Sequence, residues 1–279
     1  MEKTVLLTGS KGLIGSEALK PLLDAGFKVF TLSSATTNLM NTVDVRKLFD
    51  KLKPQYLLHF AWITNAGYLE SDVNYELRDA SFSMLKTFKE NGGKKAVFAG
   101  TCFEYDFHDE RIKETDKLNP TTVYAKCKNE LHLMCEEYAA ANDLSFGWGR
   151  IFYVTGHNEH ANRLLPTIIN NLKNNQKVLI TAGPLVRDYM YTKDIAAGFV
   201  RFLDSDVSGC VNICKGSGIS IKDYALSVAK KTGNFQMLEF ADNIENQPKS
   251  IVGDNSRMIN EVKYKPQYSI ESALEEIIK

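Results

Sequence analysis

The sequence predicts an α/β fold built on a doubly wound parallel sheet, and three observations support this. Short strand-like runs alternate with amphipathic stretches of helical length, a pattern typical of right-handed βαβ units. The strand-like runs are almost continuously apolar, as burial on both faces of a parallel sheet requires. A glycine-rich turn joins the first strand to the first helix. We therefore expect a Rossmann-type domain, followed by a smaller C-terminal α/β lobe.

The predicted elements of the first half follow one another closely. Strands are expected at Thr4–Thr8, Lys28–Leu32, Gln55–Ala61, Lys95–Gly100 and Leu144–Ile151, and helices at Leu13–Ala25, Val43–Leu52, Asn74–Asn91 and Thr122–Asn142. After Phe152 the pattern loosens. We expect a loop at Thr155–Asn162, helices at Leu164–Asn174, Asp194–Leu203 and Ile221–Thr232, and strand-like runs at Val178–Thr181 and Cys210–Cys214. No Pro/Gly/Ser-rich linker separates the halves, so the two parts should pack directly against each other.

Composition excludes several classes of protein. Of 279 residues, 44% are hydrophobic and 24% charged, close to the averages of globular proteins. Lys plus Arg and Asp plus Glu both total 34, so no overall charge favours nucleic acid or an anionic membrane. We find no signal peptide and no membrane-spanning run. The 5 cysteines show no metal-ligand spacing and are typical of reduced thiols, so we expect a cytoplasmic protein without a metal site.

The glycine-rich turn Thr8-Gly9-Ser10-Lys11-Gly12-Leu13-Ile14-Gly15 has the GxxGxxG spacing of a dinucleotide site. A strand precedes it, and a helix and a second strand follow. Gly9 suits the tight turn, Gly12 lets a pyrophosphate approach the backbone, and Gly15 permits close packing of helix on strand. The anion would then bind the free N–H groups of the helix N-terminus.

The cofactor is expected to be NADP(H), with NAD(H) as the alternative. An NAD site usually has an acidic residue after the second strand, but no acid occurs between Asp24 and Asp44. Lys11 offers a cation, and Ser33 and Ser34 offer hydroxyl groups, to a 2′-phosphate. Asn38 and Leu39, further along the same connection, are also expected at the cofactor, as are three residues after the third strand: Phe60, Ala61 and Trp62.

Two Tyr-x-x-x-Lys pairs are candidates for proton transfer: Tyr124/Lys128 and Tyr189/Lys193. A lysine four residues after a tyrosine lies on the same helical face, and its charge favours the phenolate. Tyr124 opens a helix after the fourth strand, whose end carries Thr101, and strand ends are where such sheets bind ligands. Lys193 instead precedes Asp194, which we expect to cap a helix. We therefore interpret the first pair as catalytic and the second as structural.

At this point the chain resembles the extended short-chain dehydrogenases/reductases of the nucleotide-sugar epimerase/dehydratase family. The matching segments are Thr8–Gly15, His59-Phe60-Ala61, Gly100-Thr101, Tyr124–Lys128, Arg150–Gly156, Arg163–Pro166, Arg187-Asp188-Tyr189 with Asp194, Val211-Asn212-Ile213 and Gly253–Arg257. The resemblance implies an NAD(P) domain over 1–151, with a return segment at about 189–215. It implies a nucleotide-sugar lobe over 152–188 and 216–279. Thr101 would polarise the reacting oxygen, Tyr124 would transfer the proton, and Lys128 would bind the nicotinamide ribose and lower the tyrosine pKa.

Residues after the fourth strand favour one reaction within that family. Dehydratases carry Asp-Glu where this chain has Cys102 and Phe103, and phenylalanine cannot exchange protons. Leu58–Trp62 and Gly100–Tyr105 are most similar to bacterial NADPH-dependent reductases of nucleotide-linked 4-keto-6-deoxysugars. A C4-epimerase, which uses the same three residues, is the alternative, and an NADP-binding scaffold without turnover is a third. Epimerisation at carbons 3 and 5 would need Cys102 and His157, which do not fall at that subfamily's usual positions.

The remaining expectations concern the nucleotide sugar and the partner subunit. Arg163, Arg187 and Arg257 are candidates for the diphosphate, because guanidinium groups match phosphate oxygens, although Asp188 is also a candidate partner for Arg187. Cys102, Phe103 and His157 are expected near the sugar. The resemblance also implies a homodimer, formed through helices at Asn74–Asn91 and Thr122–Asn142.

Overall fold

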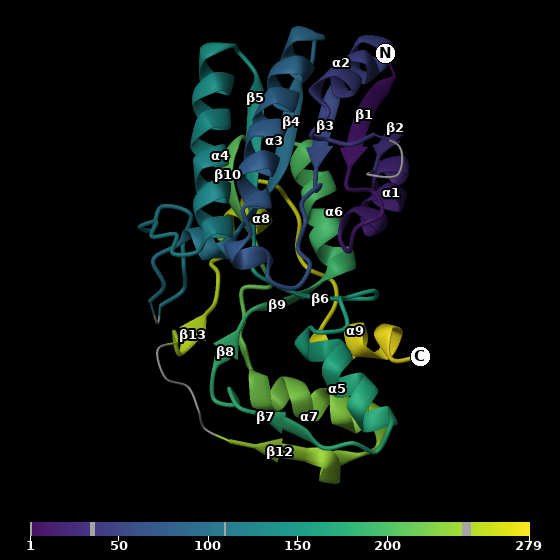
Figure 1. The fold of residues 1–279 in the computed structure, drawn as a ribbon, viewed down its shortest axis with the longest axis vertical. Coiled ribbons are helices and arrows are strands. Elements are labelled where there is room, and N and C mark those ends of the chain that lie inside the picture. Colours follow the sequence, from purple (N-terminus) through teal and green to yellow (C-terminus); the bar gives the residue numbers. More distant parts are fainter. Residues whose placement is uncertain (1, 34–36, 109, 242–246) are drawn as a thin grey trace.

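A parallel sheet of six strands forms the centre of the molecule (Figure 1). The computed structural model describes residues 2–33, 37–108, 110–241 and 247–279. Across the sheet the strands follow the order β2 (Phe27–Leu32), β1 (Lys3–Thr8), β3 (Tyr56–His59), β4 (Lys95–Thr101), β5 (Ser145–Ile151) and β10 (Gly209–Ile213). Every pair of neighbours is parallel, which confirms the predicted fold class.

Helices cover both faces of this sheet (Figure 1). One face packs against α2 (Thr42–Leu52), α3 (Val73–Glu90) and α4 (Val123–Ala141), with Phe49, Met84 and Leu131 in the shared core. The other face packs against α1 (Gly15–Asp24), α6 (Thr192–Leu203) and the short α8 (Ser256–Asn260), with Leu22, Phe199 and Met258 in the shared core. Burial on both faces explains why the strands are so apolar in sequence.

The order of the strands reverses between β1 and β3, because the chain leaves β1 for β2 on one side and returns to place β3 on the other. At such a switch point, the connections after the two strands diverge and leave a crevice at their carboxyl ends. The glycine turn follows β1, and Phe60–Trp62 follow β3. These two segments therefore meet where a ligand site is expected.

The smaller lobe lies below the sheet in Figure 1 and has its own core. Its helices are α5 (Leu164–Lys173), α7 (Ile221–Thr232) and α9 (Ile270–Ile277), and they pack with Ile168, Tyr224 and Leu274 inside. Short strands complete it. These are β6 (Tyr153–Thr155), β7 (Val178–Ile180), β8 (Val186–Arg187), β9 (Tyr189–Tyr191), β11 (Ile219–Ser220), β12 (Leu238–Phe240) and β13 (Ser250–Ile251). The described residues also form the 3-10 turns η1 (Tyr68–Glu70) and η2 (Cys102–Glu104) beside the sheet and η3 (Phe235–Met237) in the lobe.

The chain passes between the two parts more than once. After entering the lobe at β6, it returns through α6, which packs on α1, and through β10, which pairs with β5 at the edge of the sheet. Buried Asp188 lies at this junction. Its carboxylate accepts hydrogen bonds from the N–H groups of Lys215 (2.8 Å), Gly216 (3.0 Å) and Gly253 (3.2 Å). One side chain thus joins three separate segments.

Several local expectations need correction. The first helix begins at Gly15 rather than Leu13, because the residues before it form the turns of the glycine loop. The third strand ends at His59 rather than Ala61. Asp194 lies inside the first turn of α6 and does not cap it; its carboxylate accepts hydrogen bonds from Tyr264 and from the N–H groups of Gln267 and Tyr268.

All five cysteines are free thiols. Within the described ranges, no helix has the length and apolar character needed to cross a membrane.

Candidate active site

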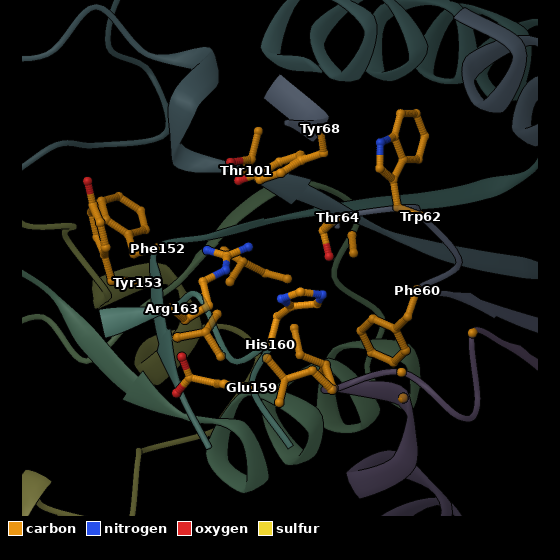
Figure 2. A pocket seen from close by; sticks show the side chains of 18 of the residues that line it. Phe60, Trp62, Thr64, Tyr68, Thr101, Phe152, Tyr153, Glu159, His160 and Arg163 are labelled. Carbon is orange, nitrogen blue, oxygen red and sulfur yellow. The ribbon is translucent and has the colours of Figure 1, made fainter. Parts of the chain in front are cut away.

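A cleft of about 640 Å³ opens at the carboxyl ends of the sheet strands, between the sheet and the smaller lobe. Its walls come from the glycine turn, from the segments after β3, β4 and β5, and from the start of α5. Figure 2 shows Thr101 and Tyr68 on one side and Phe60 and Trp62 on another, with Arg163 and His160 pointing toward the space between them. Both parts of the molecule therefore contribute to one site.

The glycine turn forms one wall through Gly9, Gly12 and Gly15 and the residues between them. Gly9 has φ +68°, and a Cβ there would lie 2.7 Å from the nitrogen of Ala61. A Cβ on Gly15 would lie 2.2 Å from the carbonyl oxygen of Gly9. The turn is thus packed too closely for side chains at either position. Within the described part of the chain, the N–H groups of Leu13 and Ile14 donate to no acceptor, so they remain available to an anion at the start of α1. This arrangement fits a dinucleotide.

Other residues expected at the cofactor lie behind this wall or beside it. Buried Thr8 bonds to His59 (Oγ1 to Nδ1, 2.6 Å) and accepts the N–H of Ala61, so it joins β1 to the segment after β3. Leu39 packs into the core under α2 and α3 and does not line the cleft. Asn38 is exposed and accepts the N–H of Met40. Ser10 and buried Ser33 are not among the residues that line the cleft, and Ser34 lies outside the described residues.

Thr101, Tyr124 and Lys128 meet inside the cleft. Thr101 ends β4, Tyr124 lies in the first turn of α4, and the Thr101 side chain is near enough to lower the pKa of Tyr124. Lys128 lies one turn further along α4 and is buried; its ammonium donates to the carbonyl oxygen of Ala99 (2.8 Å). Thr122 caps the helix by accepting the N–H of Ala125, which fixes where this face of α4 begins. The three residues expected to be catalytic are therefore neighbours.

Burial dominates the protonation of this group. It raises the pKa of Tyr124 above its ordinary value, an effect that neighbouring Tyr68 adds to and the Thr101 hydrogen bond opposes. Burial also lowers the pKa of Lys128 to about 7. In the ligand-free protein the loss of hydration outweighs the groups that favour the phenolate, so the net shift of the Tyr124 pKa is upward. The Tyr124 phenol is therefore protonated at neutral pH.

A buried ion pair, which the sequence analysis did not identify as such, supports Thr101 from below. Glu104 is fully buried and pairs with Arg150 of β5 (Oε2 to Nε, 2.7 Å). Its other oxygen accepts the N–H of Thr101 (2.9 Å), and the indole of Trp148 donates to both carboxylate oxygens. Gly100 leaves room for this arrangement, because a Cβ there would lie 2.2 Å from the Trp148 nitrogen.

The wall beside Thr101 is apolar. Cys102, Phe103 and Phe152 line it, and the ring of Phe103 meets that of Tyr153 edge to face, with centroids 6.2 Å apart. Burial raises the pKa of the Cys102 thiol, so this thiol is protonated. Phe103 stands at the cleft with no proton to exchange, as the sequence analysis expected.

The loop before α5 supplies polar groups opposite this wall. Arg163 precedes the first turn of α5, its guanidinium lies 5.5 Å from the Tyr68 ring centroid, and its charge opposes the rise that burial causes in the Tyr68 pKa. Glu159 and His160 also line the cleft, and sequence reasoning missed both. Burial raises the pKa of Glu159 to about 7. Their only sequence signal was a position within the predicted loop 155–162.

Three residues expected at the substrate do not line the cleft. Arg187 is buried one layer behind it and donates to the carbonyl oxygens of Val186 and Pro248, rather than to Asp188. Arg257 lies at the opposite end of β10, where it bonds to Glu261 and to backbone carbonyls. His157 packs near Tyr191, with ring centroids 6.5 Å apart. Contacts with neighbouring residues therefore keep each of these three side chains out of the cleft.

The second tyrosine–lysine pair does not form a site of the same kind. Tyr189 borders the cleft, but its ring stacks on Tyr224 with centroids 4.3 Å apart, while Lys193 forms an ion pair with Glu276. Tyr189 and Lys193 therefore have different partners. Across the residues that the structure describes, no group of three His, Cys, Asp or Glu side chains could hold a metal ion.

The family is shown by comparison with known sequences. The sequence model of the NAD dependent epimerase/dehydratase family matches residues 5–214, which include the glycine turn, Thr101, Tyr124 and Lys128. The chain belongs to this family of nucleotide-sugar-modifying enzymes.

Relatives with assigned names differ in reaction. The chain is 26% identical over 237 residues to a dTDP-6-deoxy-L-talose 4-dehydrogenase (NAD(+)) of Aggregatibacter actinomycetemcomitans, covering 78% of this chain and 86% of the relative. It is 23% identical over 300 residues to a UDP-glucose 4-epimerase of Corynebacterium glutamicum, covering 95% and 91%. Among solved structures, the UDP-N-acetylglucosamine 4-epimerase of Methanobrevibacter ruminantium M1 has the same fold (TM-score 0.90, 22% identity, 99% and 97% covered).

Proposed function

We propose that this protein reduces the C4 ketone of a nucleoside-diphosphate 4-keto-6-deoxysugar, using a nicotinamide dinucleotide. The observation on which this rests is that Thr101, Tyr124 and Lys128 line one cleft together with the glycine turn, with Lys128 one helical turn after Tyr124. The bound cofactor supplies the hydride. Tyr124 donates a proton to the developing alkoxide, and Thr101 hydrogen-bonds the same oxygen.

The protonation of Tyr124 supports reduction over epimerisation. A ketoreductase needs a proton donor in the resting enzyme, whereas a C4-epimerase must first remove a proton from the C4 hydroxyl group. Burial raises the pKa of Tyr124 and so keeps the phenol protonated. The ligand-free site therefore begins with the phenol protonated, as reduction requires.

The apolar wall supports a 6-deoxysugar. Cys102, Phe103 and Phe152 lie beside Thr101 and offer the substrate no polar side chain other than a protonated thiol. A methyl group at C6 would pack there, whereas a hydroxyl group would lose its hydrogen bonds to water. The relative from A. actinomycetemcomitans is named for a reaction at C4 of a dTDP-linked 6-deoxysugar, which agrees with this choice.

We propose NADP(H) as the preferred cofactor and NAD(H) as the alternative. The absence of an acid between Asp24 and Asp44 removes a charge that would repel a 2′-phosphate, and exposed Lys11 lies on the wall of the cleft. The named relative uses NAD(+). Steady-state comparison of NADPH with NADH decides between them.

The diphosphate is proposed to bind at Arg163 and the start of α5. The guanidinium group and the positive end of the helix face the same cleft. The sugar nucleotide would then span the lobe 152–188 and 216–279.

We further propose a homodimer through α3 and α4, which lie side by side, with Tyr75 and Leu133 exposed on them. Sedimentation of the wild-type protein tests the dimer.

The proposed reaction is tested by following NADPH absorbance with TDP-, CDP- and GDP-linked 4-keto-6-deoxysugars. Oxidation of NADPH by one of them, with formation of the 4-hydroxy product, is expected. The second candidate is a C4-epimerase, favoured by the relative from C. glutamicum. Interconversion of C4 epimers without added reductant, and no consumption of NADPH by any ketosugar, would show that the epimerase is correct.

A further inference from the structure

The ammonium group of Lys128 is held by an aromatic ring. Its Nζ lies 3.6 Å from the centroid of the Trp62 ring and 2.8 Å from the carbonyl oxygen of Ala99. The ring of Trp148 is more distant, at 5.8 Å. Within the described ranges, Lys128 forms no ion pair with a carboxylate. The face of an indole attracts a cation most strongly when water is excluded, as it is here.

The position of Trp62 is itself fixed by a buried amide. The Trp62 indole donates to Oδ1 of Asn74 (2.8 Å), and the Asn74 amide nitrogen donates to the carbonyl oxygens of Tyr68 (2.7 Å) and Ser71 (2.8 Å). Asn74 thereby fixes the segment 62–71 at both ends. The same segment places Tyr68 edge to face against Tyr124, with centroids 4.9 Å apart. One loop therefore contacts both Tyr124 and Lys128.

Other groups around Lys128 do not replace the ring. Glu104, from η2, raises the lysine pKa from a distance, and its carboxylate is already bonded to Arg150, Trp148 and the Thr101 backbone. Neutral His59 faces the site from β3, and Cys135 and Tyr124 face it from α4. Trp62 is thus the closest group that favours the charged lysine besides one carbonyl oxygen.

We infer that Trp62 is the positioning residue for Lys128: its ring, fixed by Asn74, favours the charged form of the buried side chain and directs it into the cleft, where it can bind the hydroxyl groups of a cofactor ribose. This inference rests on the proposed function for the role of Lys128. It adds a residue outside the Thr, Tyr and Lys trio to the machinery of the site.

The test is the titration of Lys128 in the ligand-free protein, followed by NMR of ¹³C-labelled lysine and assigned with Lys128→Met. Trp62→Leu removes the ring and is expected to lower the apparent pKa of Lys128 by about one unit. Trp62→Phe retains an aromatic face and should lower the pKa less. Phe103→Leu, which removes a different ring of the same cleft, is the matched control and should leave the titration unchanged. Melting curves establish that each variant is folded.

A second readout is the binding of NADPH or NADH, measured by calorimetry. Trp62→Leu should weaken it severalfold at pH 7, where the wild-type lysine is about half charged and the variant lysine is largely neutral, and less at pH 5, where both are charged. An unchanged Lys128 titration in Trp62→Leu would overturn the inference. A shifted titration with no turnover of any ketosugar would leave the positioning role intact and reject the proposed reaction. Turnover of a ketosugar with an unshifted Lys128 titration would support the proposed reaction and reject the positioning role.

Discussion

Tyr124 is a weak acid whose surroundings make it weaker, and this defines its role. Its ring is buried among Trp62, Tyr68 and Thr101. A phenol in such a place holds its proton until a stronger base, such as a developing alkoxide, appears.

Tyr124→Phe should therefore lower kcat by roughly 100- to 10,000-fold, because the proton donor is lost while the ring packing remains. Binding of the dinucleotide, measured by calorimetry, should be unchanged. Tyr138→Phe is the matched control, since Tyr138 lies on the same helix away from the cleft and packs on Phe82. A kcat within a few-fold of wild type in Tyr124→Phe would reject the assignment.

His132 is a different kind of buried titratable residue. Both ring nitrogens lack a hydrogen-bond partner among the described residues, and the ring stacks on Trp148 at 5.0 Å. Burial, with a smaller effect from Arg150, lowers its pKa from 6.5 to about 3. Between these values the unfolded chain binds a proton that the folded protein does not.

Stability should accordingly fall as the pH is lowered below about 6.5, with His132 contributing about 1.4 kcal/mol per pH unit. His132→Phe keeps the stacking and removes the titration. Urea unfolding at pH 7 and pH 5 should show a smaller loss for the variant than for wild type. Equal losses in both proteins would contradict this explanation. His59, whose pKa burial also lowers, acts in the same direction in both proteins.

At the scale of elements, the turn from β1 to α1 can form only because its glycines have no Cβ atoms. The turn closes so tightly that a Cβ on Gly15 would lie 2.2 Å from the carbonyl oxygen of Gly9. By contrast, Gly183 in the smaller lobe has ordinary φ, and a Cβ there would meet nothing closer than 3.6 Å.

Gly15→Ala should weaken dinucleotide binding by about tenfold or more, a loss of at least ~1.4 kcal/mol, because the loop must shift to admit the methyl group. Gly183→Ala is the control and should bind as wild type does. The measurement is calorimetric titration with NADPH and NADH. Undiminished affinity in Gly15→Ala would show that the turn is not the dinucleotide site.

The link between η2 and β5 is the buried pair Glu104–Arg150. Arg150→Met should lower the free energy of unfolding by about 3 to 5 kcal/mol, because it leaves the Glu104 carboxylate buried without its counter-charge. The double variant Glu104→Gln/Arg150→Met should recover most of that loss. Denaturant unfolding of the two proteins is the test, and equal stabilities would show that the pair contributes no coupling.

The elements that sequence reasoning predicted are those whose signals are local. The helices and strands of the first half have apolar repeats, and the glycine spacing is contained within eight residues. The same reasoning placed Thr101, Tyr124 and Lys128 together, because strand ends of a parallel sheet converge. It could not place Asn74 at Trp62 or Glu104 at Arg150, since these pairings join distant segments through side-chain hydrogen bonds.

The smaller lobe was harder to predict for a related reason. Its strands β8, β11 and β13 are two residues long, too short to show any alternation. Sequence reasoning also proposed three arginines for the diphosphate. Only Arg163 lies at the cleft, because carbonyl groups elsewhere in the fold bind Arg187 and Arg257.

At the scale of the whole molecule, Asp188 is the junction between the parts. Asp188→Ala would leave three buried N–H groups, on Lys215, Gly216 and Gly253, without their acceptor. The expected loss of stability is about 3 kcal/mol or more, at about 1 to 3 kcal/mol for each group. Glu239→Ala, which removes the exposed pair with Lys177, should cost less than about 1 kcal/mol. Thermal and chemical unfolding measure the stability of both variants. A loss in Asp188→Ala as small as that in Glu239→Ala would show that Asp188 does not stabilise the junction.

The path of the chain between its two parts also restricts how such a protein can change over time. Because α6 and β10 return to the sheet after the first passage through the lobe, the residues that would meet the sugar are not encoded in one uninterrupted block. A single genetic crossover after β5 would exchange α6 and β10 together with the lobe, and would set a foreign helix against α1. Exchange of substrate preference between relatives by recombination therefore needs two further breakpoints, one on each side of the returning segment. Stepwise substitution at the walls of the cleft is the simpler route.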